Sequence, residues 1–334
     1  MRGSPLRAAV LLAACGALMG CPPRSEQPSD AVAANPSAPV ELDERDEPAL
    51  AAAELAPLVA AHNEHARKLE TLESRASVEI RSRDADGEHF DQCEGDIFLA
   101  PGGKGALRLT KLGSNLAWIG SDGTRGWMFR LDAEPTQATV YANARSGALG
   151  DRDPIRGQGG FRLLTPDGLR SLAALAPVPA DAALERVAGA PASAPLRERF
   201  AIAWTVAGGA RLSMQFGADG KPTRVVARDE AGREILRATL SEFVRAQAEN
   251  LAIGAWPELP RKIEITTPDG ATSVRIYLGE PSAMARRMKP RFFELDALIA
   301  QLRPDTVEYL ETPVELPAQP GALDERENTG AARP

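Results

Sequence analysis

Apolar and polar residues alternate along the middle of the chain, and this pattern predicts a long series of antiparallel strands. From Ser74 onward, Ala76, Val78 and Ile80 alternate with polar residues, and an Asp- and Gly-containing turn at 84–87 leads into a second run. Further runs follow at roughly 8–12-residue spacing, which is typical of an antiparallel meander. They lie at residues 93–99, 106–112, 116–119, 125–131, 136–142, 197–206, 210–216, 222–229, 234–245, 261–267 and 273–278.

Helical periodicity appears in three places, and each place predicts one helix. The first helix lies within residues 49–73, the second is part of an insertion at about 145–195, and the third follows the last strand. Their apolar stripes are Leu55, Val59, His62, Ala66, Leu69 and Leu72, then Leu169, Leu172, Ala173 and Leu175, then Phe292, Phe293, Leu295, Leu298, Ile299 and Leu302. The predicted fold is therefore mainly β (α+β), with one domain at 49–312.

The first 21 residues have the layout of a lipoprotein signal. Arg2 and Arg7 precede an apolar run at 8–20 that is too short to span a bilayer, and Leu18-Met19-Gly20-Cys21 reads as a lipobox. We expect a type II signal peptide at 1–20 and two or three acyl chains on Cys21, which make a lasting membrane anchor. An ordinary signal peptide, or a buried helix with a chance cysteine, is the alternative. Cys15 also ends a lipobox-like sequence, but it leaves a shorter apolar run after Arg7.

Both ends of the mature chain have the composition of linkers. Residues 21–48 are rich in Pro, Ser, Ala and acids without apolar periodicity, which predicts a disordered tether, and residues 313–334 predict a disordered tail. Pro22, rather than an aspartate, follows the lipidated cysteine. This favours the outer membrane, facing the periplasm, over the inner membrane.

Composition excludes one class of partner and one kind of crosslink. Lys and Arg number 39 against 46 Asp and Glu, a net charge of −7 without a basic block, so we do not expect nucleic acid binding. The chain has three cysteines. With Cys15 removed and Cys21 acylated, Cys93 has no intrachain partner, and we interpret it as a small buried hydrophobe rather than a nucleophile.

The remaining candidate chemistry is weak. His62 and His65 flank Glu64, but the order H-N-E-H is not the zincin pattern, and His89 is the only other histidine. The acidic turn at 84–88 does not complete a calcium loop, and no G-x-S-x-G motif is present. We therefore expect no metal, no cofactor and no enzyme activity, although residue spacing alone does not exclude a hydrolase.

Three stretches of local sequence carry a family resemblance. They are the strand and turn at 94–101, the R-L strand at 107–109, and the S-D-G-x-x-x-W hairpin at 121–127. With the order of helices and strands and the lipobox, they make residues 50–280 similar to the lipoprotein-localisation family, the LolA/LolB-like proteins. The resemblance implies a half-open antiparallel β-barrel, partly closed by helices, whose concave apolar face holds acyl chains. The implied cavity residues are Val78, Ile80, Ile97, Leu99, Leu107, Leu109, Trp118, Trp127, Phe129, Ile202, Trp204, Leu212, Met214 and Phe216.

Two functions remain open at this point. The leading hypothesis is a membrane-anchored periplasmic lipoprotein that binds a lipid or lipoprotein acyl chain, in lipoprotein sorting or envelope lipid handling. The alternative is an anchored structural or interaction protein with a filled barrel that docks an envelope protein partner. A period-two apolar pattern identifies the buried face, but it does not tell whether the space behind that face is empty.

Overall fold

The computed structural model describes residues 45–84, 87–142, 165–206, 209–249, 251–284 and 288–310. The predicted signal peptide, Cys15, Cys21, most of the tether and the predicted tail at 313–334 lie outside the described residues, as does the first part of the insertion. None of the helices within the described ranges has the length and apolar character needed to cross a membrane.

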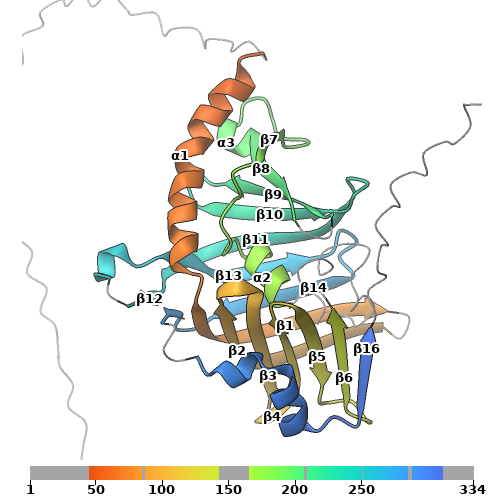
Figure 1. Cartoon of the computed structure of the whole chain (residues 1–334). Helices are drawn as coiled ribbons and strands as arrows, with labels where there is room; N and C mark the ends of the chain where they lie inside the picture. Colours follow the sequence, from red (N-terminus) through yellow and green to blue (C-terminus); the bar gives the residue numbers. More distant parts are fainter. Residues whose placement is uncertain are drawn as a thin grey trace, which may run out of the picture. The chain divides into compact units, whose positions relative to one another are not determined.

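The N-terminal half consists of one long helix and six consecutive strands. Helix α1 is Glu47–Lys68, so it ends before the last two residues of its predicted stripe, and Leu72 instead begins the first strand. Figure 1 shows α1 in orange. The strands and the short 3-10 turn among them are β1 (Leu72–Asp84), β2 (Gly87–Ala100), η1 (Pro101–Gly103), β3 (Lys104–Lys111), β4 (Ser114–Asp122), β5 (Arg125–Arg130) and β6 (Gln137–Ala142).

The described part of the insertion contains α2 (Pro166–Leu172), the helix predicted there, followed by β7 (Ala183–Arg186). The C-terminal half then adds strands close to the predicted ranges, although 196–199 is helical rather than extended. Its elements are α3 (Leu196–Arg199), β8 (Phe200–Thr205), β9 (Arg211–Phe216), β10 (Pro222–Arg228), β11 (Glu234–Arg245), β12 (Gln247–Ala248), η3 (Ile253–Ala255), β13 (Glu258–Thr266), β14 (Thr272–Leu278), β15 (Ser282–Ala283), η5 (Pro290–Phe293), α4 (Leu295–Leu302) and β16 (Thr306–Leu310).

All described strands belong to one sheet, which is open. The main path runs β16-β6-β5-β4-β3-β2-β1-β14-β13-β11-β10-β9-β8-β7, with β12 and β15 at its side. Strand β1 joins the two halves, because Val78 lies opposite Cys93 of β2 on one side and opposite Ile276 of β14 on the other. Along this path only β16 pairs in parallel, with β6 at the sheet edge. The predicted mainly β fold with a half-open antiparallel sheet is confirmed.

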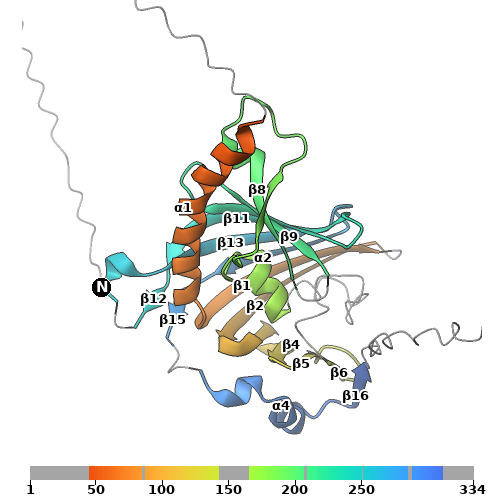
Figure 2. The same cartoon turned by 45° about the horizontal axis from the view of Figure 1, so that its top comes forward.

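The two faces of the sheet are covered by different helices. We call the face that packs against α1 and α2 the inner face, and the opposite face the outer face. Figure 2 shows α2 on one side of strands β4 and β5 and α4 on the other. The main core lies between the inner face and the first two helices, with Leu55 and Leu172 among its fully buried members. The predicted C-terminal helix is confirmed, but it covers the outer face.

Three of the predicted cavity residues were assigned to the wrong face. Trp118, Trp127 and Phe129 lie on the outer face, where they pack with Leu295 and Leu298 of α4. Their neighbours along the strands face inward instead. The physical reason is that nearly every residue of β4 and β5 is buried, so these strands are apolar on both sides and alternation does not distinguish the faces.

Candidate functional site

The inner face gathers the other eleven predicted cavity residues into one apolar cluster. All of them except the half-buried Ile202 are at most 9% exposed. Cross-strand pairs place them on the same side, as in Ile97 opposite Leu107 and Trp204 opposite Leu212. The cluster contains Val78, Ile80, Ile97, Leu99, Leu107, Leu109, Ile202, Trp204, Leu212, Met214 and Phe216. In the described chain this face is closed by protein side chains, and α1 and α2 supply the cover.

Helix α2 covers the inner face over β3 and β4. Leu169 and Leu172 are buried in the cluster, and Pro166 packs directly on the backbone at Gly105. A Cβ atom built on Gly105 would lie 2.3 Å from Cβ of Pro166, far inside van der Waals contact. Only glycine at this position therefore allows α2 to approach the sheet so closely.

A half-buried arginine attaches α2 to the sheet. Nη2 of Arg170 donates to the carbonyl oxygens of Glu70, next to the start of β1, and Ala100, at the end of β2, each at 3.2 Å. Burial lowers the pKa of this guanidinium below its ordinary value. Charge-assisted bonds to backbone carbonyls are stronger than neutral hydrogen bonds, so Arg170 holds the helix at a defined position.

Helix α1 holds the loop that follows α2. Nδ2 of Asn63 donates to the carbonyl oxygen of Val178 at 3.0 Å, and the amide of Val178 donates back to Oδ1 at 2.7 Å. Nε2 of His62 donates to the carbonyl oxygen of Ala176 at 3.1 Å. Burial lowers the pKa of His62, with the hydrogen bond to Ala176 acting in the opposite direction. The neutral ring is therefore the form that fits this site.

Two local features reduce the stability of α2 in its covered position. Oγ1 of Thr165, the residue before the helix, is buried without a hydrogen-bond partner. Ala174, just after the helix, has φ of +52°, a left-handed conformation that is unfavourable for an L residue with a side chain. A buried unsatisfied hydroxyl costs about 1–3 kcal/mol, and a left-handed residue about 1–2 kcal/mol. The cover is therefore held by a small number of specific contacts.

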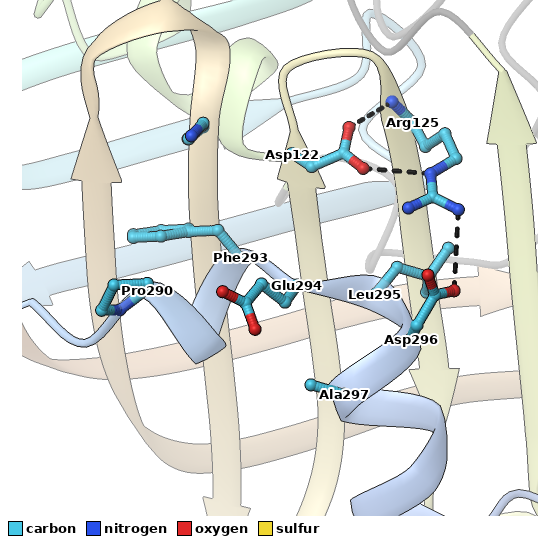
Figure 3. Close-up of a pocket in the computed structure, with 9 residues that line it drawn as sticks. Asp122, Arg125, Pro290, Phe293, Glu294, Leu295, Asp296 and Ala297 are labelled. Carbon is cyan, nitrogen blue, oxygen red and sulfur yellow. Dashed lines mark hydrogen bonds and ion pairs between the residues drawn. The ribbon is translucent and has the colours of Figure 1, made fainter.

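On the outer face, η5 and α4 enclose a hollow of about 450 Å³ against β3–β5 (Figure 3). Three of its charged residues, Asp122, Arg125 and Asp296, are joined by ion pairs. Nε of Arg125 lies 3.0 Å from Oδ2 of Asp122, and its Nη1 lies 3.7 Å from Oδ1 of Asp296 at the start of α4. Burial favours a higher pKa for Asp122, but hydrogen bonds from Thr124 and Arg125 outweigh it and hold the pKa below the usual range. This arrangement links α4 to the sheet and supplies no activated nucleophile.

The remaining reactive residues are dispersed. Cys93 is buried on the inner face, as predicted, and burial with the nearby Asp91 charge raises its pKa to about 11, so the thiolate is suppressed. The two histidines of α1 have different partners. His62 donates to the carbonyl oxygen of Ala176, and Nδ1 of His65 accepts a hydrogen bond from the amide of Glu258 at 3.1 Å. Within the ranges that the structure describes, no group of three His, Cys, Asp or Glu side chains could hold a metal ion.

Sequence reasoning missed the residues that hold the cover. Arg170 and Asn63 are polar residues on helices, and their partners are backbone carbonyls and amides about 70 to 115 residues away in the chain. A hydrogen bond between a side chain and a distant backbone group produces no recognisable residue spacing in the sequence. Gly105 lies just before the predicted strand at 106–112, but the structure places it inside β3, where a glycine often marks a close approach of another segment.

No protein-family model and no curated protein matches the sequence. Several solved structures are similar to it, and three of them are described here. A LolA superfamily protein from Nitrosomonas europaea has 10% identity and a TM-score of 0.43, over 72% of this chain and 98% of the other. A DUF1329 family protein from Desulfovibrio piger has 13% identity and a TM-score of 0.40, over 72% and 99%. An outer membrane lipoprotein-sorting protein domain from Vibrio parahaemolyticus has 11% identity and a TM-score of 0.39, over 73% and 97%. These likenesses concern the fold, and they include the family that the sequence resembles.

Proposed function

We propose that this protein is a lipid-anchored envelope protein that binds an acyl chain of a lipid or lipoprotein against the inner face of its sheet. The single observation that carries the proposal is the inner face itself. It is a continuous apolar surface, and over β3 and β4 its cover is a helix of seven residues. Displacing α2 would leave apolar side chains that only another apolar group can cover.

Apolar burial supplies the binding energy in this proposal. Each buried methylene contributes roughly 0.8 kcal/mol, so a long acyl chain can replace the apolar packing that α2 provides when it covers the sheet. Displacement of α2 also removes two unfavourable free-energy terms, because the Thr165 hydroxyl can then reach water and Ala174 can leave its left-handed conformation. Such burial is not directional, so we expect little discrimination between acyl chains of similar length. Membrane attachment through Cys21, on the periplasmic side of the outer membrane, is part of the proposal.

Substitution of Gly105 tests the proposal directly. In Gly105→Ala, the added Cβ collides with Pro166 and forces α2 away from β3. We expect this variant to bind a fluorescent palmitate analogue more tightly than the wild type, and the wild type to release phospholipid on organic-solvent extraction. Gly254→Ala is the matched control, because a Cβ at Gly254 meets no atom within 4 Å. Circular dichroism checks that both variants stay folded.

The alternative function has one observation in its favour. The inner-face cluster is already filled by the chain's own residues, with side chains such as Leu109 and Leu212 at 0% exposure. A protein with a permanently filled interior would act through its surface, as an anchored interaction protein. Folded Gly105→Ala and wild-type proteins that both fail to bind the palmitate analogue would overturn acyl binding and leave this alternative.

A further inference from the structure

The outer face of the sheet changes character where the two halves of the sheet meet. Beneath η5 and α4 it is apolar and aromatic, but along β1, β2 and β14 it carries a hollow of about 580 Å³. Most of the side chains that line this hollow are polar. Its volume is that of a small-molecule site, and its lining suits a polar ligand rather than an acyl chain.

Strand pairing arranges the polar side chains of the hollow in two rows across the sheet. The first row consists of Tyr277, Ser77, Glu94 and Thr110. The second row consists of Arg75, Asp96 and Arg108. Residues two positions apart on a strand share one face and lie about 7 Å apart. A row of hydroxyl and carboxylate groups therefore lies next to a row that contains two arginines.

The hollow has more unpaired positive charge than unpaired negative charge. Arg108 is neutralised by Asp96, because its Nε donates to Oδ2 of that residue at 3.1 Å. Arg75 and Arg261 are exposed, and neither guanidinium has a hydrogen-bond or ion-pair partner within the described ranges. Among the described residues of the lining, Glu94 is the one carboxylate without such a partner. The local excess of cations is the reverse of the chain's net charge of −7.

Small residues leave the guanidinium of Arg75 uncovered. Gly279 lies beside Arg75, since its amide donates to the carbonyl oxygen of Arg75 at 2.7 Å, and a Cβ built on Gly279 would lie 3.3 Å from Cβ of Arg75. The next outward-facing residue along β1 is the small Ser77. On the neighbouring strand, Nζ of Lys262 lies 5.8 Å from the ring centroid of Tyr277, which adds a further cation beside the hollow.

We propose that this hollow binds a small anionic sugar, a sugar acid or a sugar phosphate. A guanidinium donates paired N–H groups to carboxylate or phosphate oxygens, so Arg75 and Arg261 take the oxyanion. An ionised carboxylate only accepts hydrogen bonds, so Glu94 takes hydroxyl groups of the sugar ring. The spacing of about 7 Å between the two rows suits a ligand with its charge at one end and its hydroxyls at the other.

The unpaired Glu94 also argues against a purely anionic partner. An acidic peptide laid across the hollow would bring a second negative charge onto Glu94, and like charges at close range repel. A sugar presents hydroxyl groups there instead. The site lies on the opposite face of the sheet from the apolar cluster, so the inference is independent of acyl binding.

Isothermal titration calorimetry of the purified full chain tests the proposal with four probes. Glucuronate and glucose 6-phosphate carry a sugar ring with an oxyanion, glucose lacks the oxyanion, and inorganic phosphate lacks the ring. We expect saturable binding of at least one of the two anionic sugars, and which of them binds identifies the oxyanion. Glucose should not bind, and inorganic phosphate should bind more weakly than the anionic sugar.

Three substitutions assign the binding to this hollow. Arg75→Gln and Arg261→Gln should each weaken binding of the anionic sugar by about tenfold or more, because each removes charged hydrogen bonds to the oxyanion. Arg67→Gln is the matched control, since Arg67 is an exposed arginine on α1, which packs on the inner face. Glu94→Gln should weaken the sugar but strengthen inorganic phosphate, because it removes both an acceptor for hydroxyls and a repulsive charge. Circular dichroism checks that the variants stay folded.

Three results would overturn the proposal. They are the absence of saturable binding of both anionic sugars, equal binding by Arg75→Gln and Arg67→Gln, and inorganic phosphate binding as tightly as the anionic sugar. The last result would show a site for any oxyanion. Binding of the palmitate analogue by Gly105→Ala should be unaffected by Arg75→Gln, so the two proposals fail separately.

Discussion

The N-terminal half of the sheet is apolar on both faces, but the two faces are covered in different ways. On the inner face, α2 is held through Arg170 and by the close approach of Pro166 to Gly105. Both helices also bury aliphatic side chains, but on the outer face aromatic rings of the sheet and of η5 pack on one another. The ring of Phe292 lies 4.7 Å from that of Phe98 and 6.1 Å from that of Trp118.

This difference indicates which cover can leave without unfolding the protein. A cover fixed by two carbonyl contacts and a few apolar residues opens at the cost of those contacts. Removal of α4 would expose Trp127 and Phe129, which are fully buried beneath it. Large apolar burial of this kind is part of the core. We therefore expect local opening on the inner face and none on the outer face.

The largest expected effect concerns the outer cluster. Phe129→Ala should lower the free energy of unfolding by about 3–5 kcal/mol, because Phe129 is fully buried and the cavity left behind cannot be filled. Urea denaturation measures this change. Phe90→Ala is the control, since Phe90 is 54% exposed, and it should cost less than about 1 kcal/mol. A decrease similar to that of Phe90→Ala would contradict the packing of Phe129 beneath α4 and would favour the cavity position that the sequence predicted.

An intermediate effect is expected at the attachment of α2. Arg170→Met removes both bonds to the carbonyls of Glu70 and Ala100, which together contribute about 1.5–3 kcal/mol. Hydrogen–deuterium exchange at residues 165–175 should then accelerate about 10- to 150-fold, whereas the amides of β3 and β4 keep their protection. Arg224→Met, at an exposed residue of β10, should change neither region. Equal acceleration in α2 and in the strands would show that the cover is not a separate unit.

The smallest effect is a pH dependence at the loop that follows α2. The pKa of His62 is lowered in the folded protein, so the unfolded chain binds a proton more readily. The neutral His62 ring therefore contributes fully to the free energy of unfolding above about pH 6.5, and this contribution is lost as the pH falls through the folded pKa. Its size is about 1.4 kcal/mol for each pKa unit between the unfolded and folded chains. Urea denaturation between pH 7.5 and 5.5 should show this decrease.

His62→Gln separates titration from hydrogen bonding in that experiment. The glutamine amide can still donate to the carbonyl of Ala176, but it does not take up a proton in this range. The free energy of unfolding of His62→Gln should therefore change less between pH 7.5 and 5.5 than that of the wild type. An identical slope in the two proteins would assign the pH dependence to other groups.

The sequence predicted the inner face well because its strands alternate cleanly. Val78, Ile97 and Leu107 follow a strict period of two, and cross-strand pairing carries the inward direction from one strand to the next. The prediction failed in β4 and β5, where apolar residues point both ways, so alternation does not tell which face the aromatic residues occupy. The helix that covers them lies about 165 residues later in the chain.

Other features depend on tertiary contacts that no local pattern encodes. Strand β16 has ordinary alternation, but its pairing with β6 follows from the position of α4. The contacts of Arg170 and Asn63 are with backbone groups, which have no sequence identity.

The seam between β1 and β14 has a consequence for how the chain reaches its native state. Ile80 lies opposite Val274, almost two hundred residues later, and this pairing unites the two halves of the sheet. Contacts between residues so distant in the chain make folding slow, because a very large loop must close before they form. The first strand therefore keeps one side unpaired until synthesis has delivered β14, and most of the polypeptide must be made before the sheet is complete.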